Sequence, residues 1–216
     1  MKRIYFILTA LCICIFASAQ SMKVETFDKN TWNWTEGADK FQSVSIEDGY
    51  LVIQNLKKNK KATPYQQLAK SYAKLPLRPN ESFKLTIKYL VANYYTTAYW
   101  IFFNTSKQCL EEDVELFESY VLAAFGSWWT LVLNEGQKQE GKLPGKVKAK
   151  GEYPMEFVLR KQGRISTIEL NGIQLYEGEL KMTNSCIGFQ VPLIAAKNSY
   201  IKIDEVIIEQ ADADED

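Results

Sequence analysis

Regular alternation of apolar and polar residues is the feature that most limits how this chain can fold. In the segment Phe83–Tyr89 every second residue is apolar, and Lys84, Thr86 and Lys88 fill the alternate positions. Residues 155–160 follow the same period. Because successive side chains of a strand point to opposite faces, this period predicts antiparallel strands with one face buried and one face in water.

Two tight turns are expected at Asp48-Gly49 and Asn171-Gly172. Both dipeptides tolerate the positive φ angles that two-residue hairpin turns require. They would join the expected strands Val44–Ile46 with Tyr50–Ile53, and Ile165–Leu170 with Ile173–Tyr176.

The remaining strands complete an all-β chain. They are expected at Tyr99–Asn104, Tyr120–Phe125, Trp128–Leu133, Ile187–Val191 and Tyr200–Glu209, with one short helix at Tyr65–Ala73. About ten to twelve short strands separated by turns predict a two-sheet antiparallel sandwich or jelly roll. The sequence has neither an internal repeat nor a linker rich in Pro, Gly and Ser, so residues 20–210 are expected to form a single domain, followed by an acidic tail at 211–216.

Residues 1–19 have the three parts of a secretory signal peptide. Lys2 and Arg3 are basic, Ile4–Phe16 is apolar or neutral, and Ala17-Ser18-Ala19 offers small residues for cleavage before Gln20. A stretch of 13 residues is too short to cross a hydrocarbon layer roughly 30 Å thick. The sequence therefore predicts export to the periplasm, the cell surface or the medium, without a transmembrane span.

Cleavage would leave two cysteines, Cys109 and Cys186. An even pair in an exported protein could form one disulfide. The alternative is two separate buried thiols.

Composition excludes several classes of function. The chain has no His, which excludes Ser-His-Asp and Cys-His catalysis and His-ligated metals. Equal numbers of basic and acidic residues, 26 of each, remove the electrostatic reason to expect nucleic-acid binding. The two charge runs are typical of solvated surface: Lys57, Lys58, Lys60 and Lys61, and Asp212–Asp216.

One acidic run could carry catalysis. On a strand, Glu111, Asp113 and Glu115 would share a face at intervals of about 6.7 Å. Retaining glycosidases use two carboxyl groups about 5 to 5.5 Å apart. The same carboxylates would suit Ca²⁺. Against both uses, Glu112 would point into the core, and the segment reads equally well as an acidic surface loop.

Aromatic residues are the stronger candidates for ligand binding, because the C–H faces of sugars stack on flat rings. Trp128 and Trp129 are consecutive, so on a strand one should enter the core and the other should lie on the surface. Trp32 and Trp34 are expected to anchor the first strand. Core packing is the alternative for at least half of the clustered aromatic residues, which are Tyr94, Tyr95, Tyr99, Trp100, Trp128 and Trp129.

The order of these segments resembles a known family. The hairpin Val44–Ile53 comes first, the aromatic strand Tyr99–Asn104 follows Phe83–Val91, and Ile187–Val191 precedes the closing strand Ile201–Ile207. Together they resemble the concanavalin A-like lectin and glucanase jelly rolls, particularly laminin-G-like and 3-keto-disaccharide-hydrolase-like domains exported by Bacteroidetes-type bacteria. Further segments that carry the resemblance are Glu118–Leu122, Trp128–Leu131 and Ile168–Ile173.

The resemblance implies a concanavalin A-like fold and a role in carbohydrate chemistry. By analogy with laminarinase-type glucanases, Glu111 would be the nucleophile, Asp113 its helper and Glu115 the acid/base. The leading prediction is nevertheless non-catalytic recognition of a carbohydrate or glycoconjugate, without a cofactor. The alternatives are a glycoside hydrolase and a structural or protein-interaction module. The predicted ligand-binding residues are Tyr94, Tyr95, Trp100, Trp128 and Trp129.

Overall fold

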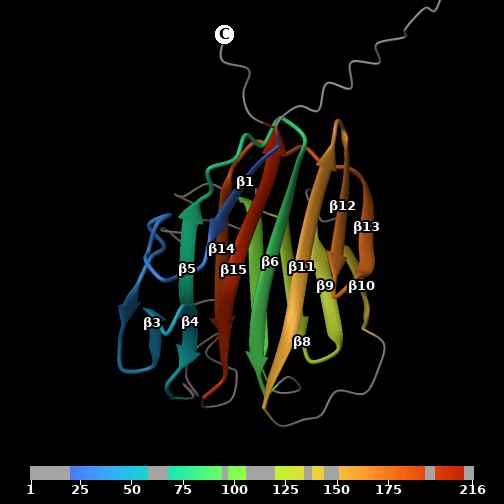
Figure 1. Cartoon of the computed structure of the whole chain (residues 1–216). Coiled ribbons are helices and arrows are strands. Elements are labelled where there is room, and N and C mark those ends of the chain that lie inside the picture. The colour runs from blue at the N-terminus through green and yellow to red at the C-terminus, as the bar shows by residue number, and fades with distance from the viewer. Residues whose placement is uncertain are drawn as a thin grey trace, which may run out of the picture.

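The protein is a β-sandwich of two antiparallel sheets (Figure 1). The computed structural model describes residues 20–57, 68–93, 97–105, 120–133, 138–143, 151–192 and 198–211. These ranges contain fifteen strands and no helix, so none of the described chain could span a membrane as a helix. The all-β, two-sheet prediction is confirmed.

The larger sheet has nine strands and faces the viewer in Figure 1. Eight of them follow the order β13-β12-β11-β6-β15-β4-β3-β2, and β1 pairs with the far end of β15. The bounds are β1 Gln20–Glu25, β2 Gly37–Ala38, β3 Gln42–Glu47, β4 Tyr50–Asn55, β6 Phe83–Ala92, β11 Glu152–Gln162, β12 Ile165–Leu170, β13 Ile173–Glu179 and β15 Tyr200–Ala211. The last strand thus includes Ala211, the first residue of the expected tail.

The smaller sheet has six strands in the order β10-β9-β8-β7-β14-β5. Their bounds are β5 Leu68–Lys74, β7 Ala98–Thr105, β8 Tyr120–Phe125, β9 Trp128–Val132, β10 Lys138–Lys142 and β14 Cys186–Pro192. Neighbours far apart in sequence, such as β14 beside β5 and β7, are typical of the crossovers in a jelly roll.

Both predicted hairpin turns are present. Asp48 and Gly49 have φ angles of 51° and 76°, and Asn171 and Gly172 have φ angles of 50° and 72°. Positive φ at both central residues is the geometry that matches the right-handed twist of paired strands. Each turn therefore sets the register of its hairpin.

The core lies between the sheets and is rich in aromatic rings. Alternate residues of the longer strands enter it, such as Leu85, Ile87 and Tyr89 of β6, as the two-residue period predicts. Tyr89 of the large sheet and Tyr99 of the small sheet are both buried, and their hydroxyl groups are 2.9 Å apart. Other fully buried rings are Phe27, Phe103, Tyr120, Phe157 and Phe189.

The expected helix Tyr65–Ala73 is wrong over its described part. Residues from Leu68 onward form β5, an edge strand paired antiparallel with β14. Ser71 and Ala73 are buried on the inner face, whereas Lys74 is exposed. Ladder hydrogen bonds and burial against the core therefore outweigh the helical preference of the Ala, Leu and Lys side chains.

Candidate functional site

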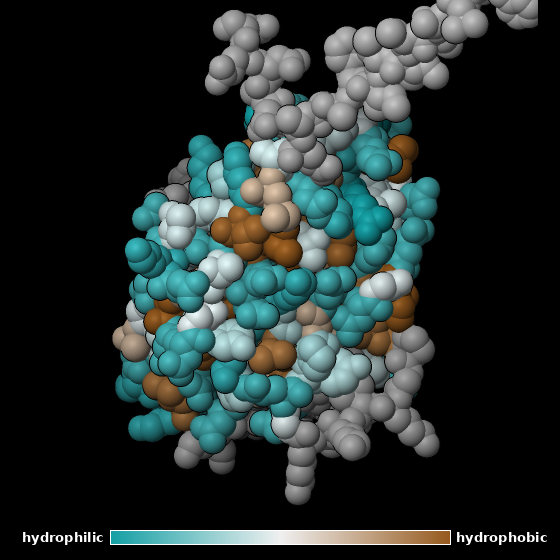
Figure 2. Space-filling model, viewed as in Figure 1, coloured by the Kyte–Doolittle hydropathy of each residue, from teal (hydrophilic) through white to brown (hydrophobic). Residues whose placement is uncertain are grey.

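The outer face of the nine-stranded sheet is covered by ion pairs between strands. Lys84 contacts Glu209 at 2.5 Å, and Lys88 contacts Glu205 at 2.7 Å. The hydrogen bond to Glu205 raises the pKa of Lys88. Figure 2 looks onto this face and shows mostly hydrophilic side chains with separate apolar spots. Two further pairs are Lys202 with Glu152 at 2.8 Å and Arg160 with Glu169 at 3.8 Å.

The outer face of the six-stranded sheet is different, because aromatic and apolar side chains cross it. The strand register places Trp100 opposite Ala123 and Gln190, and Phe102 opposite Val121 and Gly188. Tyr72 lies opposite Gly188 on the edge strand β5. We call the outward side chains Tyr72, Trp100, Phe102, Phe125 and Trp128 the aromatic face.

One half of the aromatic face is a small apolar cluster outside the main core. Phe102, Val121 and Cys186 are buried, and the partly buried Tyr72, Trp100 and Val132 pack against them. The rings of Trp100 and Phe102 meet edge to face, with centroids 6.2 Å apart and an interplanar angle of 85°. This arrangement holds Trp100 in place while leaving part of its ring uncovered.

The other half is an exposed pair of rings. Trp128 and Phe125 lie directly opposite each other in the hairpin β8–β9, and they are 60% and 52% exposed. The turn between them contains Gly126, whose φ is 56°. The ammonium group of Lys142 lies 5.4 Å from the centre of the Trp128 ring. Two large aromatic side chains, opposite in register and exposed to water, make an apolar surface of the kind that often marks a binding site.

Trp128 and Trp129 divide as expected for consecutive residues of a strand. Trp129 points the other way and packs against the core. The ring of Trp129 also lies over Gly141 of β10, so close that an added Cβ there would be 2.6 Å from it. Trp34 is buried in the core, and the backbone N–H of Trp32 donates to the carboxylate of Glu25 at the end of β1 over 2.8 Å.

The structure therefore brings two of the five predicted binding residues, Trp100 and Trp128, onto one face. They are two strands apart, which is about 10 Å across a sheet. Tyr99, also considered, is a core residue. The other calls lie outside the described residues: Tyr94, Tyr95, Glu111, Asp113, Glu115 and Cys109.

The expected disulfide and the expected Ca²⁺ site both involve residues outside the described ranges. Cys186 is buried on the aromatic face, and its expected partner Cys109 lies outside those ranges. Within the described part of the chain, no three or more Asp, Glu or Cys side chains are grouped so that they could hold a metal ion.

Phe125 and Tyr72 were missed in the sequence, for different reasons. Phe125 could have been found, because the short connection Gly126-Ser127 places it opposite Trp128. Tyr72 lies in the segment expected to be helical, so its face could not be assigned.

Comparison with known proteins supports the fold. No protein-family model matches the sequence, and no curated protein matches it significantly. Among solved structures, a Bacillus subtilis protein of unknown function with a galectin-like fold is similar over 88% of this chain and 96% of its own, at 12% identity and a TM-score of 0.58.

Two other solved structures have named activities. SCLam, a non-specific endo-β-1,3(4)-glucanase of family GH16, is 10% identical with a TM-score of 0.60, over 90% of this chain and 92% of its own. The Emp46p carbohydrate recognition domain, in a metal-free form, is 12% identical with a TM-score of 0.58, over 85% of this chain and 90% of its own. The chain thus has the jelly-roll fold that is shared by such lectin domains and glucanases.

Proposed function

We propose that this protein recognises a carbohydrate or glycoconjugate through the aromatic face and does not cleave it. The observation that carries the proposal is the exposed pair of Trp128 and Phe125, on the same outer face of the small sheet as Trp100. Sugar rings present apolar C–H faces that stack on such surfaces. The fold agrees with this role, since a carbohydrate recognition domain shares it.

Binding is favoured over hydrolysis by the charges on this face. Among its described strand residues, Glu140 is the sole carboxylate, and it is paired with Lys138 at 2.7 Å. A retaining glycosidase needs two carboxyl groups about 5 to 5.5 Å apart. The hydrolase alternative thus depends on Glu111, Asp113 and Glu115.

We also propose that the protein acts after export from the cytoplasm. The expected signal peptide at residues 1–19 would export the chain, so the glycan would be met in the periplasm, at the cell surface or in the medium. A protein partner carrying that glycan is equally compatible with the aromatic face.

A glycan array probed with the chain from Gln20 tests the proposal, because this chain contains every described strand. We expect selective binding that Trp128→Ala weakens by about tenfold or more, since the stacked ring is lost. The matched control is Ile165→Ala, which removes an apolar side chain that is 43% exposed on the other sheet. Silence across plant, host and bacterial glycans, or equal losses in both variants, would contradict the proposal.

Two further measurements separate recognition from metal-dependent binding and from hydrolysis. A requirement for Ca²⁺ would indicate a metal site, with Glu111, Asp113 and Glu115 as the first residues to substitute. Release of shortened sugars that Glu115→Gln abolishes would establish hydrolysis in place of recognition.

A further inference from the structure

An open pocket of about 590 Å³ lies at one end of the sandwich, where β5 ends and β14 begins. One wall is the connection from β5 to β6, residues 77–81, and the other is the segment 183–186. Lys74, the last residue of β5, also lines the pocket. This volume is within the range of small-molecule sites, about 300 to 1,000 Å³.

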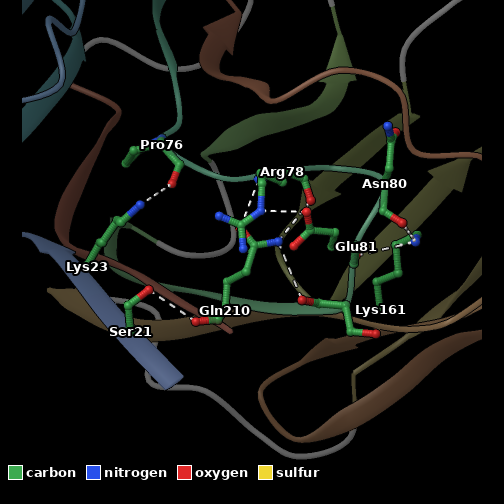
Figure 3. Close-up of polar contacts among 9 residues, drawn as sticks. Ser21, Lys23, Pro76, Arg78, Asn80, Glu81, Lys161 and Gln210 are labelled. Carbon is green, nitrogen blue, oxygen red and sulfur yellow. Dashed lines mark hydrogen bonds and ion pairs between the residues drawn. The ribbon is translucent and has the colours of Figure 1, made fainter. Parts of the chain in front are cut away.

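The first wall is held by side chains from three strands of the large sheet, as Figure 3 shows. The Gln210 amide accepts from the backbone N–H of Arg78 at 2.8 Å and donates to the Arg78 carbonyl at 2.9 Å. Lys161 donates to the Asn80 carbonyl at 2.7 Å, and Lys23 donates to the Pro76 carbonyl at 3.0 Å. These contacts make the connection a preformed wall.

The second wall is held by Asn104 and Tyr120. The Asn104 side-chain oxygen accepts from the backbone N–H groups of Thr183 at 2.7 Å and Asn184 at 2.9 Å. The Asn104 amide and the Tyr120 hydroxyl both donate to the Lys181 carbonyl, each over 3.0 Å. Burial raises the pKa of Tyr120, so this hydroxyl keeps its proton at neutral pH. Both walls are therefore ordered before a ligand enters, which lowers the entropic cost of binding.

The charge of the pocket favours an anion. Its described lining has two cations, Lys74 and Arg78, and one carboxylate, Glu81, which contacts the Arg78 guanidinium at 2.6 Å. No hydrogen bond or ion pair joins the exposed Lys74 ammonium to another described residue. Amide and hydroxyl groups of Asn80, Asn184 and Ser185 also line the pocket, and the other lining residues, Leu77, Pro79, Thr183 and Cys186, carry no charge. One net positive charge among neutral donors and acceptors matches a ligand with one negative charge and several hydroxyl groups.

The pocket adjoins the aromatic face. Lys74 lies opposite Cys186 in the register of β5 and β14, and it is two residues along the strand from Tyr72. Cys186 itself packs with Phe102. We propose that the pocket binds the carboxylate of an acidic sugar whose neighbouring units lie on the aromatic face. This inference rests on the proposed function and adds the class of glycan.

Trigalacturonic acid and its methyl ester are suitable probes, because they differ in charge and share their hydroxyl groups. We expect the acid to bind about tenfold more tightly than the ester, as one charge-assisted hydrogen bond would provide. Lys74→Met should remove that preference and leave the ester's affinity unchanged, and Lys74→Arg should keep most of it. The preference should also weaken as salt is added. The affinities can be measured by calorimetry.

Lys40→Met is the matched control. Lys40 is also an exposed lysine, but it lies away from the pocket. It is two residues from Gln42, which lies opposite Asn55 in the register of β3 and β4. Asn55 donates to the carbonyl of Pro192, at the other end of β14 from Cys186. The variant should keep the full preference for the acid. Equal affinity for acid and ester with binding still sensitive to Trp128→Ala would overturn this inference alone. Equal losses in Lys74→Met and Lys40→Met would also overturn it. Absence of binding by both probes and by every neutral glycan would contradict the proposed function as well.

Discussion

Thr86 places a buried hydroxyl group on the ion-paired outer face of the large sheet. Its side chain points outward between Ile207 and Val158, its two partners in the register, and the residue is only 5% exposed. The hydroxyl oxygen is buried, and it forms no hydrogen bond with any residue that the structure describes. Burying such a group costs free energy that an apolar side chain of the same shape avoids.

Replacing Thr86 with Val should therefore leave the free energy of unfolding unchanged or raise it by about 1 kcal/mol. Urea denaturation measures the change. The matched variant is Thr167→Val on β12, a strand of the same sheet that is separated from β6 by β11. There the side chain is only partly buried and the hydroxyl can stay hydrated. A loss of stability at position 86 clearly larger than that at position 167 would contradict this account.

Trp128 and Trp129 show how far the burial of single side chains could be predicted from the sequence. Alternation along a strand correctly separates Trp128 from Trp129. It cannot tell which of them enters the core, because that depends on which face of β9 the other sheet covers. The exposure of Trp128 therefore became clear only with the pairing of the strands.

Among the elements, hairpins closed by Asp-Gly and Asn-Gly were predictable, because their signals are local. The edge strands were harder. β10 is Lys-Gln-Glu-Gly-Lys, with no apolar residue to reveal a strand, and it forms because it pairs with β9 along its whole length. β5 was mistaken for a helix because its helical preference is local and its pairing with β14 comes from more than 100 residues later in the chain.

Gly141 lets the edge strand β10 pack closely against the ring of Trp129. Because an added Cβ would be 2.6 Å from the Trp129 ring, Gly141→Ala should displace either that ring or the strand. We expect a loss of about 1 to 3 kcal/mol in the free energy of unfolding, typical of overpacking. The control is Gly37→Ala, where an added Cβ meets no atom within 4 Å. Equal stability of the two variants in thermal denaturation would contradict the close packing of Trp129.

An ion cluster that reaches over β6 should make stability depend on pH. Glu152 accepts from Lys202 and from the Tyr200 hydroxyl, each over 2.8 Å, and these hydrogen bonds lower the pKa of Glu152 from its ordinary 4.5. A lowered folded-state pKa stabilises the fold above about 4.5, and this contribution is lost as pH falls through the folded-state value. The same hydrogen bond raises the pKa of Lys202 above 10.5, so its contribution is lost as pH rises through that higher value.

Glu152→Gln should consequently be less stable than the unsubstituted protein at pH 7, by up to about 1 kcal/mol for a partly exposed pair. The difference should shrink toward zero as the pH falls well below 4.5. Glu47→Gln is the control, since Glu47 is exposed and makes no ion pair with any described residue. Denaturant titrations at several pH values measure both variants, and a difference that grows on acidification would contradict the assignment.

At the scale of the whole molecule, the two outer faces have different chemistry on the same scaffold. The large sheet presents cross-strand ion pairs, and the small sheet presents aromatic rings. Composition and alternation were enough to predict two sheets, but the strand order that aligns Tyr72, Phe102 and Trp100 depends on long-range pairing. Part of the aromatic face was therefore visible in the sequence as individual residues, and the end pocket was not visible at all.

If a glycan lies on the aromatic face, as we propose, its binding should be visible in the indole signals of particular members of the five tryptophans. In a ¹⁵N-labelled sample, titration with the glycan that binds best on the array should shift the side-chain N–H signals of Trp128 and Trp100. Trp34, which stacks on Phe189 in the core, should not respond. Saturable binding that leaves the signals of Trp128 and Trp100 in place would contradict the account.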